Sequence, residues 1–159
     1  MRLFVPPPVA LLIAAALAWV LARETPLTKF DFPGRTLVAV VILLAGLALM
    51  LTAAWSFWRA GTSINPLRPG RARVLLTGGV FAISRNPIYL ADVLLLLALV
   101  VWLSMPLNLL IVVGFVGYLQ RYQIRPEERV LAAKFGAEYA RYRRSVRRWL
   151  GRYPTARHH

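Results

Sequence analysis

Residues 84–119 read SRNPIYLADVLLLLALVVWLSMPLNLLIVVGFVGYL. A polar start, SRNP, leads into a long apolar run that is broken at residues 104–106, Ser-Met-Pro. Asparagine is favoured just before a helix and proline fits the first helical turn, so a helix is predicted to begin at Asn86–Pro87. The break at 104–106 predicts a tight hairpin of two apolar helices, over about 88–103 and 106–122.

Two more apolar segments precede this hairpin, at about residues 6–22 and 36–58. Each is long enough to cross the hydrocarbon core of a bilayer as a helix. The chain has 159 residues, of which 58% are hydrophobic, and a soluble domain rarely carries so large an apolar fraction. We therefore predict an all-α fold: an integral membrane helical bundle with about four transmembrane helices, forming a single domain over residues 1–159.

The charge distribution predicts the orientation of this bundle. The formal net charge is +14, and arginines concentrate in the 59–87 loop and after residue 120, whereas the 23–35 loop mixes both signs. Because cytoplasmic loops are enriched in lysine and arginine, we expect both termini in the cytoplasm, with 59–87 and 123–150 on that side. We expect a protein of a bacterial inner membrane, whose basic surface meets anionic lipid rather than nucleic acid.

Residue types that bind metals are scarce in this chain. Cysteine is absent, and the two histidines are His158 and His159. These two end the chain as the residues of an expression tag would, so we leave them out of the site. Disulfides, thiolate ligands and a cysteine nucleophile are excluded, and we expect no metal site.

The basic tail carries its own apolar pattern. Between residues 125 and 150 apolar side chains recur at intervals of three and four residues, which predicts an amphipathic cytoplasmic helix. Pro126 fits its first turn, and Glu127 and Glu128 lie where the helix dipole favours negative charge. The apolar positions are Leu131, Phe135, Tyr139, Tyr142, Val146 and Trp149.

Three polar features near the membrane surface have both a ligand-binding and an ordinary structural interpretation. The helix start at Asn86, with Arg85 beside it, suits a carboxylate or phosphate, or it is a capped helix with an arginine that reaches the interface. Glu127 and Glu128 either face a cationic or diol-bearing ligand or only stabilise a helix start. Asp92, one turn inside an apolar helix, is a functional candidate, unless it only reaches water or an arginine.

Three blocks together carry a family resemblance: GTSINP (61–66), LLTGGVFAISRNPIYL (75–90) and RPEERVLAAKFGAEYARYRRSVRRWL (125–150). In this order and spacing they resemble the membrane methyltransferase family that includes isoprenylcysteine carboxyl methyltransferases and phospholipid N-methyltransferases. The resemblance covers about residues 55–150. It implies a helical site for S-adenosylmethionine at the cytoplasmic membrane surface, without a Rossmann domain.

The resemblance also implies roles for individual residues. The cofactor would lie between the loop that enters the RNP-x-Y helix and the C-terminal helix, with Arg85 and Glu128 as catalytic residues. Many family members have histidine where this chain has Asn86, and asparagine cannot act as an acid or base near neutral pH. The implied cofactor-binding residues are Gly79, Phe81, Arg85, Asn86, Pro87, Tyr89, Glu127 and Glu128. We add Tyr139, which with Phe81 and Tyr89 could enclose the adenine.

The acceptor implied by this family is lipophilic and enters from the bilayer. A prenylated cysteine carboxylate, a phospholipid amine, a quinone-like lipid and a lipophilic thiol all fit the sequence. An amine must lose a proton, which Glu128 or Asp92 could accept, whereas a carboxylate needs only an arginine such as Arg85 or Arg125. Two rival functions are a non-catalytic membrane protein that binds anionic lipid or a partner through its basic C-terminal helix and, ranked last, a transporter built around Asp92.

Overall fold

The computed structural model of the chain describes residues 5–24, 30–62 and 74–154. In this part the regular structure is helical, apart from one isolated bridge between Val146 and Arg152, which confirms the all-α prediction there. The helices are α1 (Pro7–Glu24), α2 (Arg35–Arg59), α3 (Pro87–Leu103), α4 (Leu109–Tyr118) and α5 (Arg125–Ser145). Two short 3₁₀ helices, η3 (Gly79–Ala82) and η4 (Pro106–Asn108), and a π-helical segment, η5 (Leu119–Ile124), complete the order.

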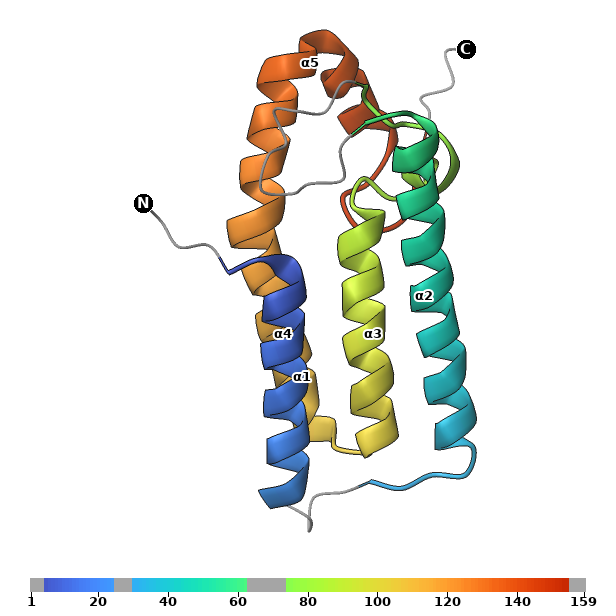
Figure 1. Cartoon of the computed structure of the whole chain (residues 1–159), viewed down its shortest axis with the longest axis vertical. Coiled ribbons are helices and arrows are strands. Elements are labelled where there is room, and N and C mark those ends of the chain that lie inside the picture. Colours follow the sequence, from blue (N-terminus) through green and yellow to red (C-terminus); the bar gives the residue numbers. More distant parts are fainter. Residues whose placement is uncertain (1–4, 25–29, 63–73, 155–159) are drawn as a thin grey trace.

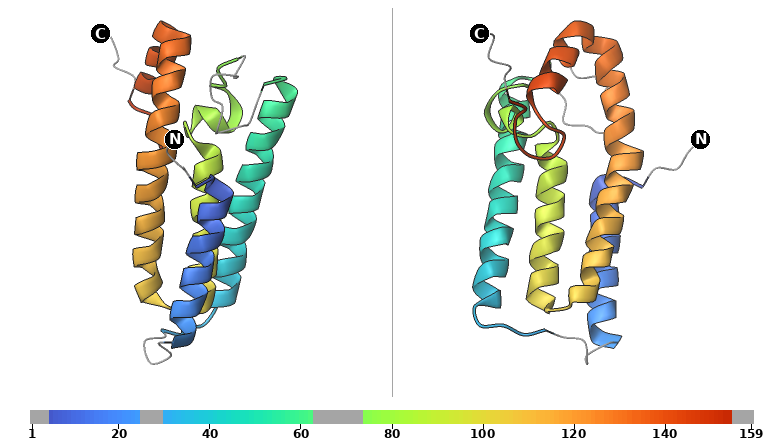
Figure 2. Two further views of the ribbon diagram at one scale, coloured as in Figure 1. Left: turned by 60° about the vertical axis from the view of Figure 1, so that its left-hand side comes forward. Right: turned by 180° about the vertical axis from the view of Figure 1, so that it is seen from behind.

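Helix α3 is the centre of the bundle. It contacts α1, α2 and α4, and α1 also contacts α4 (Figures 1 and 2). The neighbours run up and down, so the start of α3, the end of α2 and the start of α5 gather at one end (Figure 1). The turn between α3 and α4 lies at the opposite end, where Ser104 in the left-handed conformation ends α3 and Pro106 opens the next helix.

Small residues form the contacts between these helices. α1 buries Ala14, Ala18 and Ala22, which lie on one face at intervals of four residues. In α2 a Cβ atom added at Gly46 would lie 3.1 Å from Leu94 Cβ of α3. Small side chains let helix backbones approach closely, which is how helices associate in membranes.

Large apolar side chains point outward instead. α1 and α2 are long and apolar enough to cross a membrane, with mean hydropathies of 1.5 and 2.8, while α3 has 17 residues. Exposed large apolar side chains are Leu12, Ile13, Leu17 and Val20 in α1 and Leu37, Val41, Leu44, Leu51, Trp55 and Trp58 in α2. A monomer in water rarely exposes such continuous apolar faces, whereas helices that face lipid do. That four helices cross the bilayer stays a prediction.

The C-terminal half differs from the sequence-based prediction. We expected an apolar helix to end near residue 122 and a separate helix to begin at about residue 125, but α4, η5 and α5 form one continuous rod (Figure 1). The π-helical segment carries the chain into Pro126, whose missing N–H interrupts ordinary α-helical pairing. Glu127 and Glu128 therefore do not lie at a free helix N-terminus, and the dipole argument for them does not apply.

The predicted helix over residues 125–150 is also wrong in its shape and its end. Gly136 has φ 46° and ψ −118°, and the rod bends there. The helix ends at Ser145, and Val146 is extended. The bend divides α5 into a first arm before Gly136 and a second arm, residues 137–145. The second arm folds back over the end of the bundle where α3 begins (Figures 1 and 2).

The segment after α5 fastens the loop that enters α3. The Arg85 N–H donates to the Arg147 carbonyl (3.1 Å), and the Gly151 N–H donates to the Ile83 carbonyl (2.7 Å). The Tyr142 hydroxyl donates to the Phe81 carbonyl at 2.6 Å. Residues more than 60 positions apart thus build one end of the bundle.

Candidate functional site

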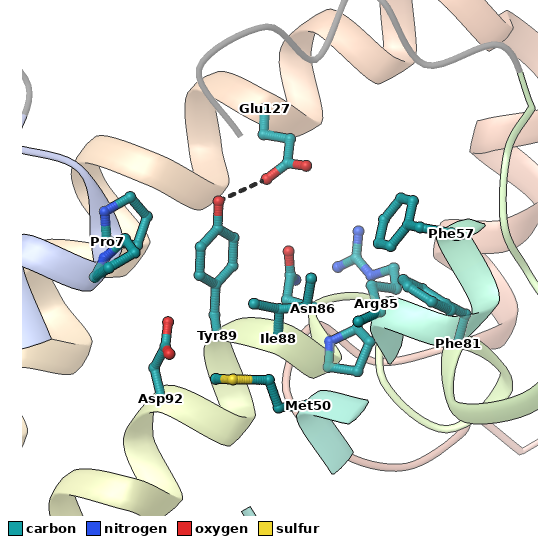
Figure 3. Close-up of a pocket in the computed structure, with 13 residues that line it drawn as sticks. Pro7, Met50, Phe57, Phe81, Arg85, Asn86, Ile88, Tyr89, Asp92 and Glu127 are labelled. Carbon is teal, nitrogen blue, oxygen red and sulfur yellow. Dashed lines mark hydrogen bonds between the residues drawn. The ribbon is translucent and has the colours of Figure 1, made fainter. Parts of the chain in front are cut away.

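A cavity of about 270 Å³ lies at the end of the bundle where α1 and α3 begin and α2 ends. Its walls come from four helices and from the loop before α3 (Figure 3). It is lined by Pro7 and Pro8 of α1, Met50, Ala54 and Phe57 of α2, Phe81 of η3, Arg85 and Asn86, Pro87, Ile88, Tyr89 and Asp92 of α3, and Glu127 of α5.

One wall of this cavity is apolar and aromatic. The Phe57 and Phe81 rings meet edge to face, with centroids 5.4 Å apart. Phe81 is buried because η3 directs it into a cluster with Ala53 and Tyr142. Gly79 opens η3 with φ 58°, a left-handed conformation that suits glycine. Gly79 shapes the loop but does not line the cavity.

Arg85 supplies the positive charge in the cavity. Its side chain is 8% exposed, and its Nη1 lies 2.9 Å from Glu128 Oε1. Its Nε is buried and has no hydrogen-bond partner within the described part of the chain. A buried N–H without a partner costs free energy, so Arg85 has a donor that a bound acceptor would satisfy.

Glu127 faces the cavity and accepts a hydrogen bond from the Tyr89 hydroxyl at 3.1 Å (Figure 3). The pKa of the Glu127 carboxyl is raised to about 7, chiefly by burial; the Tyr89 hydrogen bond opposes the rise and the charge of Glu128 adds to it. Figure 3 shows Glu127 at the hydroxyl end of Tyr89 and Asp92 near its backbone end. The cavity thus holds two carboxyl groups and one guanidinium.

Glu128 does not line this cavity. Its carboxylate accepts two hydrogen bonds from Arg148, from Nε at 3.0 Å and from Nη2 at 2.7 Å, in addition to the ion pair with Arg85. Tyr139 also lies outside the cavity walls, next to this group. Burial raises the pKa of the Tyr139 hydroxyl to about 12, and the charges of Glu128 and Arg85 act on it in opposite directions.

Asn86 does precede α3, but its side chain does not cap the helix, contrary to the expectation from sequence. The Asn86 Nδ2 donates to the Arg148 carbonyl at 3.0 Å, and the Asn86 N–H donates to Ser84 Oγ at 3.1 Å. The amide therefore fixes the C-terminal segment against the loop. Pro87 follows as the first residue of α3.

The predicted site residues are thus divided between two places. Phe81, Arg85, Asn86, Pro87, Tyr89 and Glu127 line the cavity, whereas Gly79, Glu128 and Tyr139 lie around it. The walls from α1 and α2 were not predicted: Met50, Ala54 and Phe57 carry no motif, and only tertiary packing brings them here. Of the block GTSINP, residues 63–66 lie outside the described residues, as do Arg68, Arg71, Arg73 and the two histidines. Within the described residues no group of three or more histidine, cysteine or acidic side chains is placed to hold a metal ion.

Comparisons with known proteins bear on this arrangement. A protein of Haemophilus influenzae, described as an uncharacterized protein, is 47% identical over 62 residues, which is 39% of this chain and 98% of that protein. No solved structure matches the chain. The family model described as phospholipid methyltransferase matches residues 34–138, a range that runs from the start of α2 into the second arm of α5 and contains most of the cavity. The chain therefore belongs to the phospholipid methyltransferase family, as the sequence motifs indicated.

Proposed function

We propose that this protein is an S-adenosylmethionine-dependent methyltransferase that acts on a lipophilic acceptor at the membrane–cytoplasm interface. The observation that carries the proposal is the cavity at the start of α3, where an aromatic wall meets Arg85, Glu127 and Asp92. A reaction between a charged soluble cofactor and a lipid needs such a junction. Family membership supports a methyl-transfer reaction and association with membranes.

The cavity residues fit the chemical groups of the cofactor. The unpartnered Nε of Arg85 suits the cofactor carboxylate, and Glu127 suits its ammonium group. Phe57 and Phe81 offer ring faces and edges to the adenine. When bound, the cofactor supplies a methyl group on a sulfonium, so these residues need only orient it and exclude water.

The charges of the cavity favour an amine as the acceptor over a carboxylate. A carboxylate acceptor would meet two acidic side chains, Glu127 and Asp92, and one arginine already paired with Glu128. An amine must lose a proton before it attacks the methyl group. Asp92 lies on the α3 side of the cavity, toward the bundle (Figure 3), and is the proton acceptor we assign. Glu128 is less suited to that role because Arg85 and Arg148 hold its carboxylate.

The same proposal includes the orientation in the membrane. Helices α1, α2, α3 and α4 would cross a bacterial inner membrane, with both termini in the cytoplasm. Within the described residues, arginines are more numerous at the end of the bundle that holds the cavity, for example Arg59, Arg85 and Arg125. At the opposite end Arg35 forms an ion pair with Asp31. Arginine-rich ends face the cytoplasm, so the cofactor would enter from there.

Calorimetric titration of the detergent-solubilised protein with S-adenosylmethionine and S-adenosylhomocysteine tests the cofactor site. We expect saturable binding that weakens by about tenfold or more in Arg85→Lys and Glu127→Gln, because each loses a charge-assisted contact. Glu138→Gln is the matched control, since Glu138 is exposed on α5 and lies outside the cavity. Absence of binding in folded protein, in lipid as well as in detergent, would overturn the proposal.

Methyl transfer to two acceptors separates the acceptor classes. With phosphatidylethanolamine and a prenylcysteine offered to the same preparation, we expect transfer to the amine. In Asp92→Asn we expect turnover to fall by about 100-fold or more while cofactor affinity stays within error, as for loss of a proton acceptor. Transfer to the prenylcysteine alone would reject the amine and leave the cofactor assignment standing.

A further inference from the structure

A second cavity, of about 630 Å³, lies beside the first arm of α5. Adjacent residues of α5 belong to different cavities, since Glu127 lines the first and Glu128 lines the second. The charged residues that line the second cavity are five arginines and one glutamate: Arg121, Arg125, Arg129, Arg143, Arg148 and Glu128. We call it the basic cavity.

The arginines of the basic cavity come from three separate segments. Arg121, Arg125 and Arg129 follow one another at intervals of four residues along η5 and α5. Arg143 belongs to the arm of α5 that returns after the bend at Gly136, and Arg148 belongs to the segment after the helix. The bend turns the second arm of α5 back toward the first (Figure 2), and arginines from both arms line the basic cavity.

Acidic side chains leave most of this charge uncompensated. The chain has six acidic side chains, all within the described residues, and Glu128 is the one that lines the basic cavity. Its ion pairs are with Arg85 and Arg148. Within the described residues Arg121, Arg125, Arg129 and Arg143 form no ion pair. Like charges at four-residue spacing repel one another, so a bound anion would relieve this repulsion.

The position of the basic cavity indicates where such an anion comes from. η5 directly follows the apolar helix α4, and the rings of Tyr118 and Tyr122 meet at this junction with centroids 5.2 Å apart and planes tilted by 35°. Tyrosines gather at the boundary between apolar chains and water in membrane proteins. Arg121 lies between these tyrosines and Arg125 follows one turn later, where the phosphates of a bilayer would lie. Clusters of four to eight basic residues at that level attract anionic lipid.

We propose that the basic cavity is a binding site for a phosphate group, such as that of an anionic phospholipid headgroup, held by the arginines of both arms of α5. Guanidinium groups bind phosphate oxygens in bidentate pairs, and arginines of both arms line this one cavity. The site is separate from the methyl-transfer cavity, which holds one arginine and two carboxyl groups. The proposal of a phosphate site does not depend on whether the chain transfers methyl groups.

Titration of the full-length protein in a non-ionic detergent tests this site with three probes. The probes are inorganic phosphate, dihexanoyl phosphatidylglycerol and, as a control without phosphate, dihexanoyl glycerol. The double variant Arg129→Gln/Arg143→Gln removes one arginine from each arm. The matched control is Arg141→Gln/Arg144→Gln, which removes the same charge from exposed positions of α5 that do not line the cavity.

We expect saturable binding of a phosphate-bearing probe, weakened by about tenfold or more in Arg129→Gln/Arg143→Gln and unchanged within twofold in the control pair. Equal binding of phosphate and phosphatidylglycerol would assign the site to the phosphate group itself, and binding of phosphatidylglycerol alone would assign it to lipid. An equal loss of affinity in both double variants would mean that binding depends on overall charge and not on this cavity, and would overturn the proposal. So would binding of dihexanoyl glycerol as tight as that of the phosphate-bearing probes, or no saturable binding in folded protein.

Discussion

Two adjacent glutamates of α5 have different surroundings. Successive side chains of a helix point about 100° apart, so Glu127 meets Tyr89 in the cavity while Glu128 meets Arg148. The sequence motif treats the two as a pair. The motif cannot predict that their surroundings differ, because Arg148, which binds Glu128, lies twenty positions later in the sequence. The bend at Gly136 brings that segment to Glu128.

The pKa of Glu127 predicts how cofactor binding depends on pH. Burial raises this pKa to about 7, so in the folded protein the carboxyl is neutral below that pH and ionised above it. A neutral carboxyl offers no charge to the cofactor ammonium group, and its ionisation must accompany binding. We expect the dissociation constant of S-adenosylhomocysteine to fall as the pH rises toward about 7, by up to about tenfold per pH unit, and then to level off.

Calorimetry over a pH series checks this dependence, with Glu127→Gln as the diagnostic variant. Glutamine cannot ionise, so we expect the variant to bind weakly with an affinity that no longer changes near pH 7. Glu138→Gln should keep the wild-type profile. A profile in Glu127→Gln that still follows the wild type would assign the titration to another group.

At the scale of helices, local signals in the sequence predict most boundaries. Proline at Pro87 and the break at residues 104–106 place the hairpin, and α3 begins at Pro87 and ends at Leu103. Local signals fail after Tyr118. Pro126 is as compatible with a new helix as with a π-helical segment before it, and only the packing of the rod against α1 and α3 decides between these.

The bend in α5 lies at Gly136. It brings the second arm of α5 back over the cavity end of the bundle, and arginines of both arms then line the basic cavity. The φ of 46° with ψ of −118° at Gly136 is a conformation that residues with a Cβ rarely adopt. We expect Gly136→Ala to lower the free energy of unfolding by about 1–3 kcal/mol and to weaken binding at the basic cavity, because the second arm would no longer face the first. Thermal unfolding in detergent and phosphate titration measure the two effects.

Gly117→Ala is the matched control for this substitution. Gly117 lies in α4 with a φ that ordinary side chains adopt, and a Cβ there would meet nothing within 4 Å. Alanine favours a helix over glycine, so we expect the stability of Gly117→Ala to be equal to or above that of the wild type. An equal loss of stability in Gly136→Ala and Gly117→Ala would show that the protein tolerates an added methyl group at neither position. The loss in Gly136→Ala would then be no evidence that the bend needs glycine.

At the scale of the whole molecule, the motif side of the cavity could be predicted and the facing side could not. Arg85, Tyr89 and Glu127 belong to motifs that the family uses, and the structure brings them to one cavity. Met50 and Phe57 are ordinary apolar residues of an apolar helix. They line the cavity because Gly46 lets α2 pack closely against α3, and the sequence of α2 does not state which of its faces does so.

The two ends of the bundle differ in charge, which predicts opposite sides of the membrane for them. Ala60 follows α2 at the cavity end, and Leu107 lies in the turn between α3 and α4 at the other end (Figure 1). The chain has no cysteine, so Ala60→Cys and Leu107→Cys each introduce a single thiol. We expect a membrane-impermeant maleimide to label Leu107→Cys in spheroplasts and Ala60→Cys only in inverted vesicles, because arginine-rich ends face the cytoplasm.

Labelling in both kinds of vesicle distinguishes this topology from its alternatives. The reversed pattern would place the cavity outside the cytoplasm, away from the cofactor supply, and would contradict the proposed function as well as the orientation. Labelling of both positions from one side would mean that the helices lie on the membrane surface, or that the number of helices that cross the membrane differs from four. Retained binding of S-adenosylhomocysteine in each cysteine variant shows that the protein under test is folded, because the cavity needs α2, α3 and α5 together.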